Sequence, residues 1–177
     1  MKIYNIVTGS LEENCYLLVK GNECLLVDPG SEEKLIIQKI GRLSLKGILI
    51  THHHFDHIGA LEALTRLYNA DVYDSNTCSK GAYSVGEFNF DVILTPGHTD
   101  DSITFYFKSE KIMFTGDFLF KGTIGRTDLS TGNELAMKKS LSVIKQYEDD
   151  VVIYPGHGDF TTLKEEKNNN EYLFTNW

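Results

Sequence analysis

The chain divides into short apolar runs separated by turn-forming residues, and the spacing of the apolar positions distinguishes strands from helices. Three runs of strand-forming residues open it, at positions 2–7, 14–19 and 24–28, and the turns Gly9-Ser10 and Gly21-Asn22 separate them. Short strands joined by such turns are typical of antiparallel sheets. The first part of the chain therefore predicts an antiparallel meander.

Beyond the meander, strands and helices alternate. The predicted elements are, in chain order, a helix through Ile36, Ile37 and Ile40, a strand at 47–51, a helix ending near Leu67 or Tyr68, strands at 70–73, 88–95, 102–107 and 111–115, a helix from about 133 to 147, and a strand at 151–154. Ser31 is the predicted N-cap of the first helix. The stretch 74–86 is polar and irregular, and the tail from Leu163 predicts a short charged helix or a frayed end.

This order of elements bounds the architecture. A chain of 177 residues with 41% hydrophobic content can bury one sizeable core but hardly two, and no segment is long enough to be a linker. We therefore expect a single domain over residues 1–177. Because both halves contain strands as well as helices, the economical fold is α+β, with two β-sheets packed face to face and helices outside.

The composition indicates which binding partners and which cellular compartment to expect. With 17 basic and 25 acidic residues the formal charge is −8, and no basic stripe could follow a phosphate backbone, so nucleic acid is not an expected partner. Cys15, Cys24 and Cys78 lack a CxxC spacing, which favours reduced, buried thiols over a disulfide framework. No apolar run has the length of a signal-peptide core or a membrane span. We expect a cytoplasmic protein that does not bind a membrane, and the sequence leaves its oligomeric state open.

Histidine is concentrated in one window. Four of the six histidines lie between positions 52 and 57, directly after an apolar run. In an extended loop, side chains two residues apart point the same way, so His52 and His54 share a side, Asp56 follows in the same parity, and His53 points away. Imidazole and carboxylate groups at this density are ligands for Zn2+ and similar metals. The alternative is a solvated, histidine-rich surface loop.

Three later strands end in a related way. Each is followed by a Gly or Pro-Gly turn and then one candidate ligand, which is His98, Asp117 or His157. Glycine lets the backbone approach closely or adopt positive φ, so these turns can direct a side chain toward the mouth of a sheet sandwich. Each residue alone is readily explained as a turn or cap residue. Together with the histidine window they predict a metal site.

In their order along the chain these residues resemble a known pattern. The series His52-x-His54-x-Asp56-His57, His98, Asp117 and His157 is similar to that of the metallo-β-lactamase superfamily. Other segments resemble the glyoxalase II-like (hydroxyacylglutathione hydrolase-like) members, namely 27–30, 96–99, 115–117, 125–129 and 154–158. The resemblance covers the whole chain and implies an αββα sandwich of two mixed β-sheets with helices on the outer faces. It also implies a one- or two-metal site at one edge.

The resemblance also implies a role for each ligand. Three residues would hold a first metal ion, three a second, and one would bridge them: His52, His54 and His98; Asp56, His57 and His157; and Asp117, respectively. Asp28 would orient a ligand from behind, although an Asp before proline is equally explained as a turn former. The implied cofactors are two divalent ions, in the first place Zn2+, with iron or manganese as alternatives.

Two such ions about 3.5 to 4 Å apart would activate a bridging hydroxide as the nucleophile and polarise a carbonyl group. Asp56 could hold this hydroxide by a hydrogen bond as well as bind metal. Because a thiolate leaves without a strong general acid, we expect hydrolysis of a small-molecule thioester. S-lactoylglutathione or a similar acylated thiol is the substrate class that the resemblance implies.

The chain departs from glyoxalase II in two respects. Glyoxalase II adds a helical C-terminal domain that contacts glutathione, whereas only 20 residues follow His157 here. Asp100 and Asp101 stand where relatives have small uncharged residues, and we expect them to face either the metals or the substrate approach. The alternative is that both are solvated turn residues.

Other functions remain as alternatives. A persulfide dioxygenase has a similar pattern but uses a single iron, and the sequence does not separate it from a hydrolase. A hydrolase of another ester or amide is also compatible. A secreted β-lactam hydrolase would need an export signal and a nuclease a basic face, and a metal-stabilised binding module would close its coordination shell.

Overall fold

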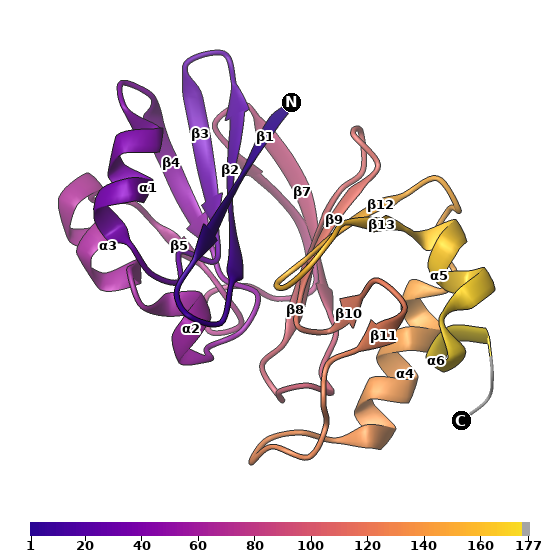
Figure 1. The fold of residues 1–177 in the computed structure, drawn as a ribbon. Coiled ribbons are helices and arrows are strands. Elements are labelled where there is room, and N and C mark those ends of the chain that lie inside the picture. The colour runs from indigo at the N-terminus through magenta and orange to yellow at the C-terminus, as the bar shows by residue number, and fades with distance from the viewer. Residues whose placement is uncertain (175–177) are drawn as a thin grey trace.

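The computed structural model describes residues 1–174 (Figure 1), and its first half forms a five-stranded sheet. The strands, in spatial order, are β1 (Lys2–Thr8), β2 (Glu13–Lys20), β3 (Glu23–Val27), β4 (Ser44–Leu49) and β5 (Val72–Tyr73). The first three pair antiparallel, and β4 and β5 then pair parallel. The predicted meander is therefore confirmed, and the sheet is mixed.

The second half forms a six-stranded sheet. Its strands, in spatial order, are β13 (Thr161–Thr162), β12 (Val152–Pro155), β9 (Ile112–Gly116), β8 (Ile103–Phe107), β7 (Phe88–Leu94) and β6 (Gly81–Val85). Only the β9–β12 pair is parallel, so this sheet is also mixed. A separate small hairpin consists of β10 (Leu119–Phe120) and β11 (Thr123–Ile124).

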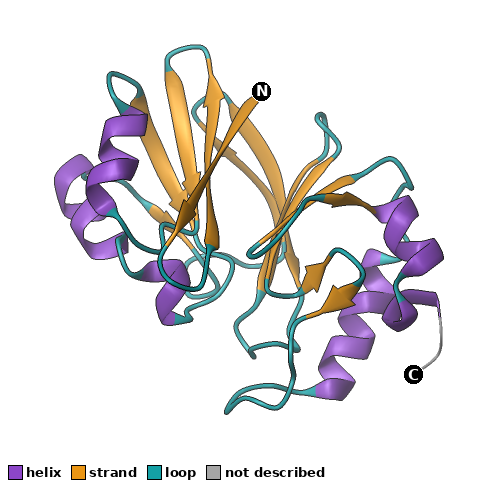
Figure 2. Cartoon of the chain, in the orientation of Figure 1, coloured by secondary structure: helices purple, strands orange, loops and turns teal. Residues whose placement is uncertain are grey.

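Helices cover the outer faces of both sheets, as Figure 2 shows. On the first sheet lie α1 (Glu33–Ile40) and α3 (Leu61–Tyr68), with the short α2 (Phe55–Ile58) at its edge; on the second lie α4 (Glu134–Ile144), α5 (Leu163–Asn169) and α6 (Glu171–Phe174). Between the sheets, aromatic and aliphatic residues such as Leu18, Leu25, Phe88 and Phe105 form a buried core. The predicted αββα sandwich is confirmed.

Two local predictions were wrong. Ser31 does not cap α1; the cap position is Glu32, which has a left-handed backbone (φ 51°), and the Ser31 backbone N–H instead donates to Thr8 Oγ1. The stretch 74–86 is not all loop, because β6 pairs with β7 through a turn at Gly86. As an edge strand, β6 exposes small and polar residues, so its sequence lacks the apolar alternation of a buried strand.

Two expectations from composition were tested. The three cysteines are free and buried, as predicted. Burial, reinforced by the charge of Glu23, raises the pKa of the Cys24 thiol to about 12. Over residues 1–174, no helix has the length and apolar character needed to cross a membrane.

Candidate metal centre

The predicted site residues lie at one edge of the sandwich, beyond the carboxyl ends of four strands. The histidine window follows β4 in the first sheet. His98, Asp117 and His157 follow β7, β9 and β12 in the second sheet. The site therefore combines side chains from both sheets.

His52, His54, His98 and Asp117 form a first group, in which the candidate ligand atoms lie within 4.8 Å of one another. His54 Nδ1 is 3.1 Å from His52 Nε2 and 3.0 Å from His98 Nε2. Asp117 Oδ2 is 3.6 Å from His98 Nε2. The structure thus brings together the three histidines that the resemblance assigned to one ion.

Asp56, His57 and His157 form a second group of the same tightness. Asp56 Oδ2 lies 3.3 Å from His157 Nε2 and 3.9 Å from His57 Nε2. Asp117 Oδ1 lies 3.3 Å from His57 Nε2 and 3.6 Å from His157 Nε2. Because its other oxygen faces His98, Asp117 stands between the two groups.

Two of the histidines present a ring nitrogen lone pair to the site. His98 Nδ1 lies 2.8 Å from the carbonyl oxygen of Arg126, and His157 Nδ1 lies 3.0 Å from that of Leu11. A carbonyl only accepts, so Nδ1 carries the proton in both rings and Nε2 presents a lone pair. Within residues 1–174, the buried atoms His57 Nε2 and Asp117 Oδ1 have no hydrogen-bond partner. Lone pairs that face the site, beside buried ligand atoms without a partner, fit divalent metal ions such as zinc or iron.

Asp28 holds His57 from behind. Its backbone is left-handed (φ 48°), a conformation that Asp tolerates better than most residues. Oδ1 accepts from the Thr51 backbone N–H at 2.7 Å, and Oδ2 accepts from Thr51 Oγ1 at 2.6 Å and from His57 Nδ1 at 3.0 Å. This arrangement turns His57 Nε2 toward Asp117, which is the orienting contact expected of Asp28.

The protonation of the site follows from these contacts. Burial lowers the pKa of His57, but the charges of Asp117 and Asp28 and the hydrogen bond to Asp28 outweigh it and leave that pKa well above its usual range. Burial also opposes ionisation of Asp117, yet the charge of the adjacent His57 holds the pKa of Asp117 far below its usual value. The pKa values of His52 and His54 are lowered by burial and by neighbouring histidines. Neutral imidazole is the form that binds metal.

Strand β2 supports the loop that carries His157, a feature that the sequence did not indicate. The Asn14 side chain donates to the carbonyl oxygens of Pro155 at 3.1 Å and Gly158 at 2.9 Å. Tyr16 Oη donates to Pro155 O at 2.7 Å. These contacts join the first sheet to the second beside the site. The only hint in the sequence is a polar Asn at the start of an apolar strand.

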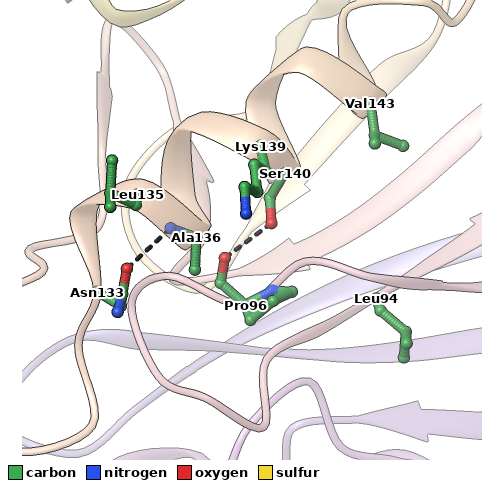
Figure 3. A pocket seen from close by; sticks show the side chains of 8 residues that line it. All are labelled: Leu94, Pro96, Asn133, Leu135, Ala136, Lys139, Ser140 and Val143. Carbon is green, nitrogen blue, oxygen red and sulfur yellow. Dashed lines mark hydrogen bonds between the residues drawn. The ribbon is translucent and has the colours of Figure 1, made fainter.

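Helix α4 braces the loop that carries His98. Ser140 Oγ donates to Pro96 O at 2.7 Å, and the Asn133 backbone N–H donates to Gly97 O at 2.8 Å. Asn133 also caps α4 by accepting from the Ala136 backbone N–H (Figure 3). A groove of about 490 Å³ lies outside this brace, where the helix faces Leu94 and Pro96. The Pro96–His98 loop is thereby fixed from the outer layer of the fold.

His53, Asp100 and Asp101 lie near the site but outside both ligand groups. His53 points away from both groups, as predicted from its parity, and its Nδ1 lies 2.5 Å from Asp101 Oδ2. Its Nε2 lies 3.0 Å from Asp74 Oδ2. Asp101 therefore faces His53 rather than either ligand group, and Asp100 is exposed.

Comparisons with known proteins agree with this geometry. A model of the Metallo-beta-lactamase superfamily matches residues 8–77 and 71–157. Hydroxyacylglutathione hydrolase GloC of Haemophilus influenzae is 32% identical, and the match covers 98% of each chain.

Two solved structures are also similar. The crystal structure of BLEG-1 B3 metallo-beta-lactamase has a TM-score of 0.94 and 28% identity, and the match covers 98% of this chain and 100% of that one. The crystal structure of TTHA1623 in a di-iron-bound form has a TM-score of 0.86 and 31% identity, with 96% of this chain and 100% of that chain covered. The similarity therefore extends over the whole fold, including the edge that carries both groups.

Proposed function

Because the chain belongs to the metallo-beta-lactamase superfamily, a superfamily of metal-dependent hydrolases, we propose that it is a binuclear thioester hydrolase of the hydroxyacylglutathione hydrolase type. The observation that carries this proposal is the pair of ligand groups that share Asp117, with its two oxygens facing different groups. A single-ion site would not need the second group. A closed structural site would not need seven donors.

Each residue has a role in this proposal. The first group would hold one divalent ion, the second group another, and Asp117 would link them. When bound, the ions supply Lewis acidity and lower the pKa of a coordinated water. Asp56, on the second group, would accept a hydrogen bond from the attacking water and so fix its orientation. Asp28 and Thr51 would keep His57 aimed at the centre.

A thioester is the favoured substrate because its thiolate leaving group does not require a general acid in the protein. A thiolate departs without protonation by a strong acid, whereas an amide nitrogen requires one. The whole-length similarity to a hydroxyacylglutathione hydrolase supports the same substrate class. We therefore favour S-lactoylglutathione or a related acylated thiol.

Zinc is the first choice for both ions, with iron or manganese as alternatives. Histidine and carboxylate ligands accept all three metals. The similar TTHA1623 structure is a di-iron form, which supports two ions per chain without deciding between metals. We also propose that the enzyme works in the cytoplasm, where its free thiols would remain reduced.

The test is a metal and substrate assay on the purified protein. Elemental analysis should give close to two ions per chain. Hydrolysis of S-lactoylglutathione should be seen as a loss of thioester absorbance without oxygen uptake. Oxygen uptake on glutathione persulfide with a single iron would refute this proposal in favour of a dioxygenase. Faster turnover of a β-lactam than of any thioester would also refute it, in favour of the activity in the name of BLEG-1.

A further inference from the structure

His53 is the one histidine of six that belongs to neither ligand group. It lies between His52 and His54 in the chain, yet its ring is held on the opposite side of the loop. Two carboxylates hold it there, Asp101 at Nδ1 and Asp74 at Nε2. Burial lowers the pKa of His53, but the hydrogen bonds and charges of these carboxylates raise it overall.

These two contacts connect the loop of His53 to two other loops, one that carries Asp101 and one that carries Asp74. Asp101 lies three residues after His98, so its contact with His53 connects the loop of His52 and His54 to the loop of His98. All three histidines of the first group therefore lie on the two loops that this contact joins.

Asp74 provides a fixed anchor on the third loop. Its Oδ1 accepts from the backbone N–H groups of Asn76 and Thr77 at 3.0 and 2.9 Å, so its carboxylate is held within a tight turn. The other oxygen of the same carboxylate faces His53 Nε2. The ring of His53 is thus fixed at both ends.

We propose that His53 is a positioning residue that sets the spacing between His52, His54 and His98, and hence the affinity of the chain for the ion of the first group. This inference rests on the metal centre proposed above. The second group should be much less sensitive, because Asp28 holds His57 and the Leu11 carbonyl holds His157. No change of charge on His53 is required, only the two contacts of its ring.

The geometry distinguishes the contacts of the two ring nitrogens. The side-chain amide of asparagine places an N–H near the position of Nδ1, whereas that of glutamine places it near Nε2. His53→Asn therefore keeps the link to Asp101, which joins the two ligand loops. His53→Gln keeps only the link to Asp74.

The experiment is a calorimetric titration of the metal-free, full-length protein with Zn2+, accompanied by the visible spectrum of the Co2+ form. His98→Ala and His157→Ala identify which binding step belongs to which group. His53→Ala and Asp101→Ala should weaken binding to the first group by about tenfold to a hundredfold, the range found for partners that orient ligands. Asp100→Ala removes a neighbouring charge without this contact and is the matched control.

The outcomes distinguish the role of His53 from the existence of the metal centre. The proposal is supported if His53→Asn restores most of the first-group affinity while His53→Gln does not, and if urea denaturation shows all variants folded. It is overturned if His53→Ala binds both ions like the wild type, if Asn and Gln are equally impaired, or if Asp100→Ala matches Asp101→Ala. Wild-type protein that binds no ion would overturn the metal centre itself, and the role of His53 with it.

Discussion

Replacing Gly156 with alanine should disturb the metal centre directly. A Cβ atom at this position would lie 2.3 Å from Asp117 Oδ1 and 2.6 Å from the Cε1 atom of His57. Ordinary contacts between such atoms begin near 3.4 Å, so both groups would have to move by about 1 Å. The backbone of Gly156 is not left-handed, so the cost arises from space alone.

The magnitude follows from two effects. Overpacking a tight site costs about 1–3 kcal/mol, which should appear in the free energy of unfolding of the metal-free protein. A displacement of about 1 Å in a reacting constellation can lower the rate by about a hundredfold. Gly156→Ala should therefore lower kcat/KM for a thioester by about that factor, even when metal is saturating.

The control lies two residues along the same loop. At Gly158 a Cβ would meet nothing within 4 Å, but φ is +74°, so alanine there costs about 1–2 kcal/mol of backbone strain without touching a ligand. Urea denaturation and steady-state kinetics on both variants separate stability from catalysis. The steric explanation fails if Gly156→Ala keeps wild-type kcat/KM, or if Gly158→Ala loses as much activity.

Three further outcomes are expected. Asp117→Ala should lose both ions and activity together, and elemental analysis showing two retained ions would contradict its bridging position. Asn14→Ala should cost about 1–3 kcal/mol in urea denaturation, because it removes two hydrogen bonds of about 0.5–1.5 kcal/mol each, to the carbonyls of Pro155 and Gly158; an unchanged midpoint would show that these contacts are dispensable. At pH 8, Cys24 with a pKa of about 12 is ionised in about one molecule in ten thousand, so it and Cys15 should react with Ellman's reagent only on unfolding. Rapid labelling of the native protein would contradict their burial.

Much of the fold was predictable because most strands appear in the sequence as short apolar runs. The apolar runs before His52, Asp117 and His157 identify strands, and a turn directly after a strand places the next side chain at a sheet edge. The site was predictable for the same reason, since each candidate ligand stands within a few residues of a strand end. That each of these residues binds metal stays a prediction.

The features that sequence reasoning missed depend on contacts between distant segments. Asn14 and Tyr16 meet the loop after β12 across about 140 positions of the chain, and nothing near them in sequence indicates that partner. Asp101 shows no local sign of its contact with His53. The predicted N-cap of α1 was wrong because the left-handed Glu32 stands between Ser31 and the helix, and the Ser31 backbone N–H is held by Thr8 Oγ1, a residue distant in sequence.

Since each ligand group includes residues that follow strands of both sheets, an ion could contact its full ligand set only after the two halves have docked. It would then stabilise the docked state by RT ln(1 + [M]/Kd), which is about 2.7 kcal/mol when free metal exceeds Kd a hundredfold. The donors are also spread along the chain, from His52 to His157. A nascent chain would therefore complete the second group only after β12 and His157 have been made. The thermal stability of the protein would therefore rise with the concentration of free metal. A lack of metal would lower the amount of folded protein as well as its activity.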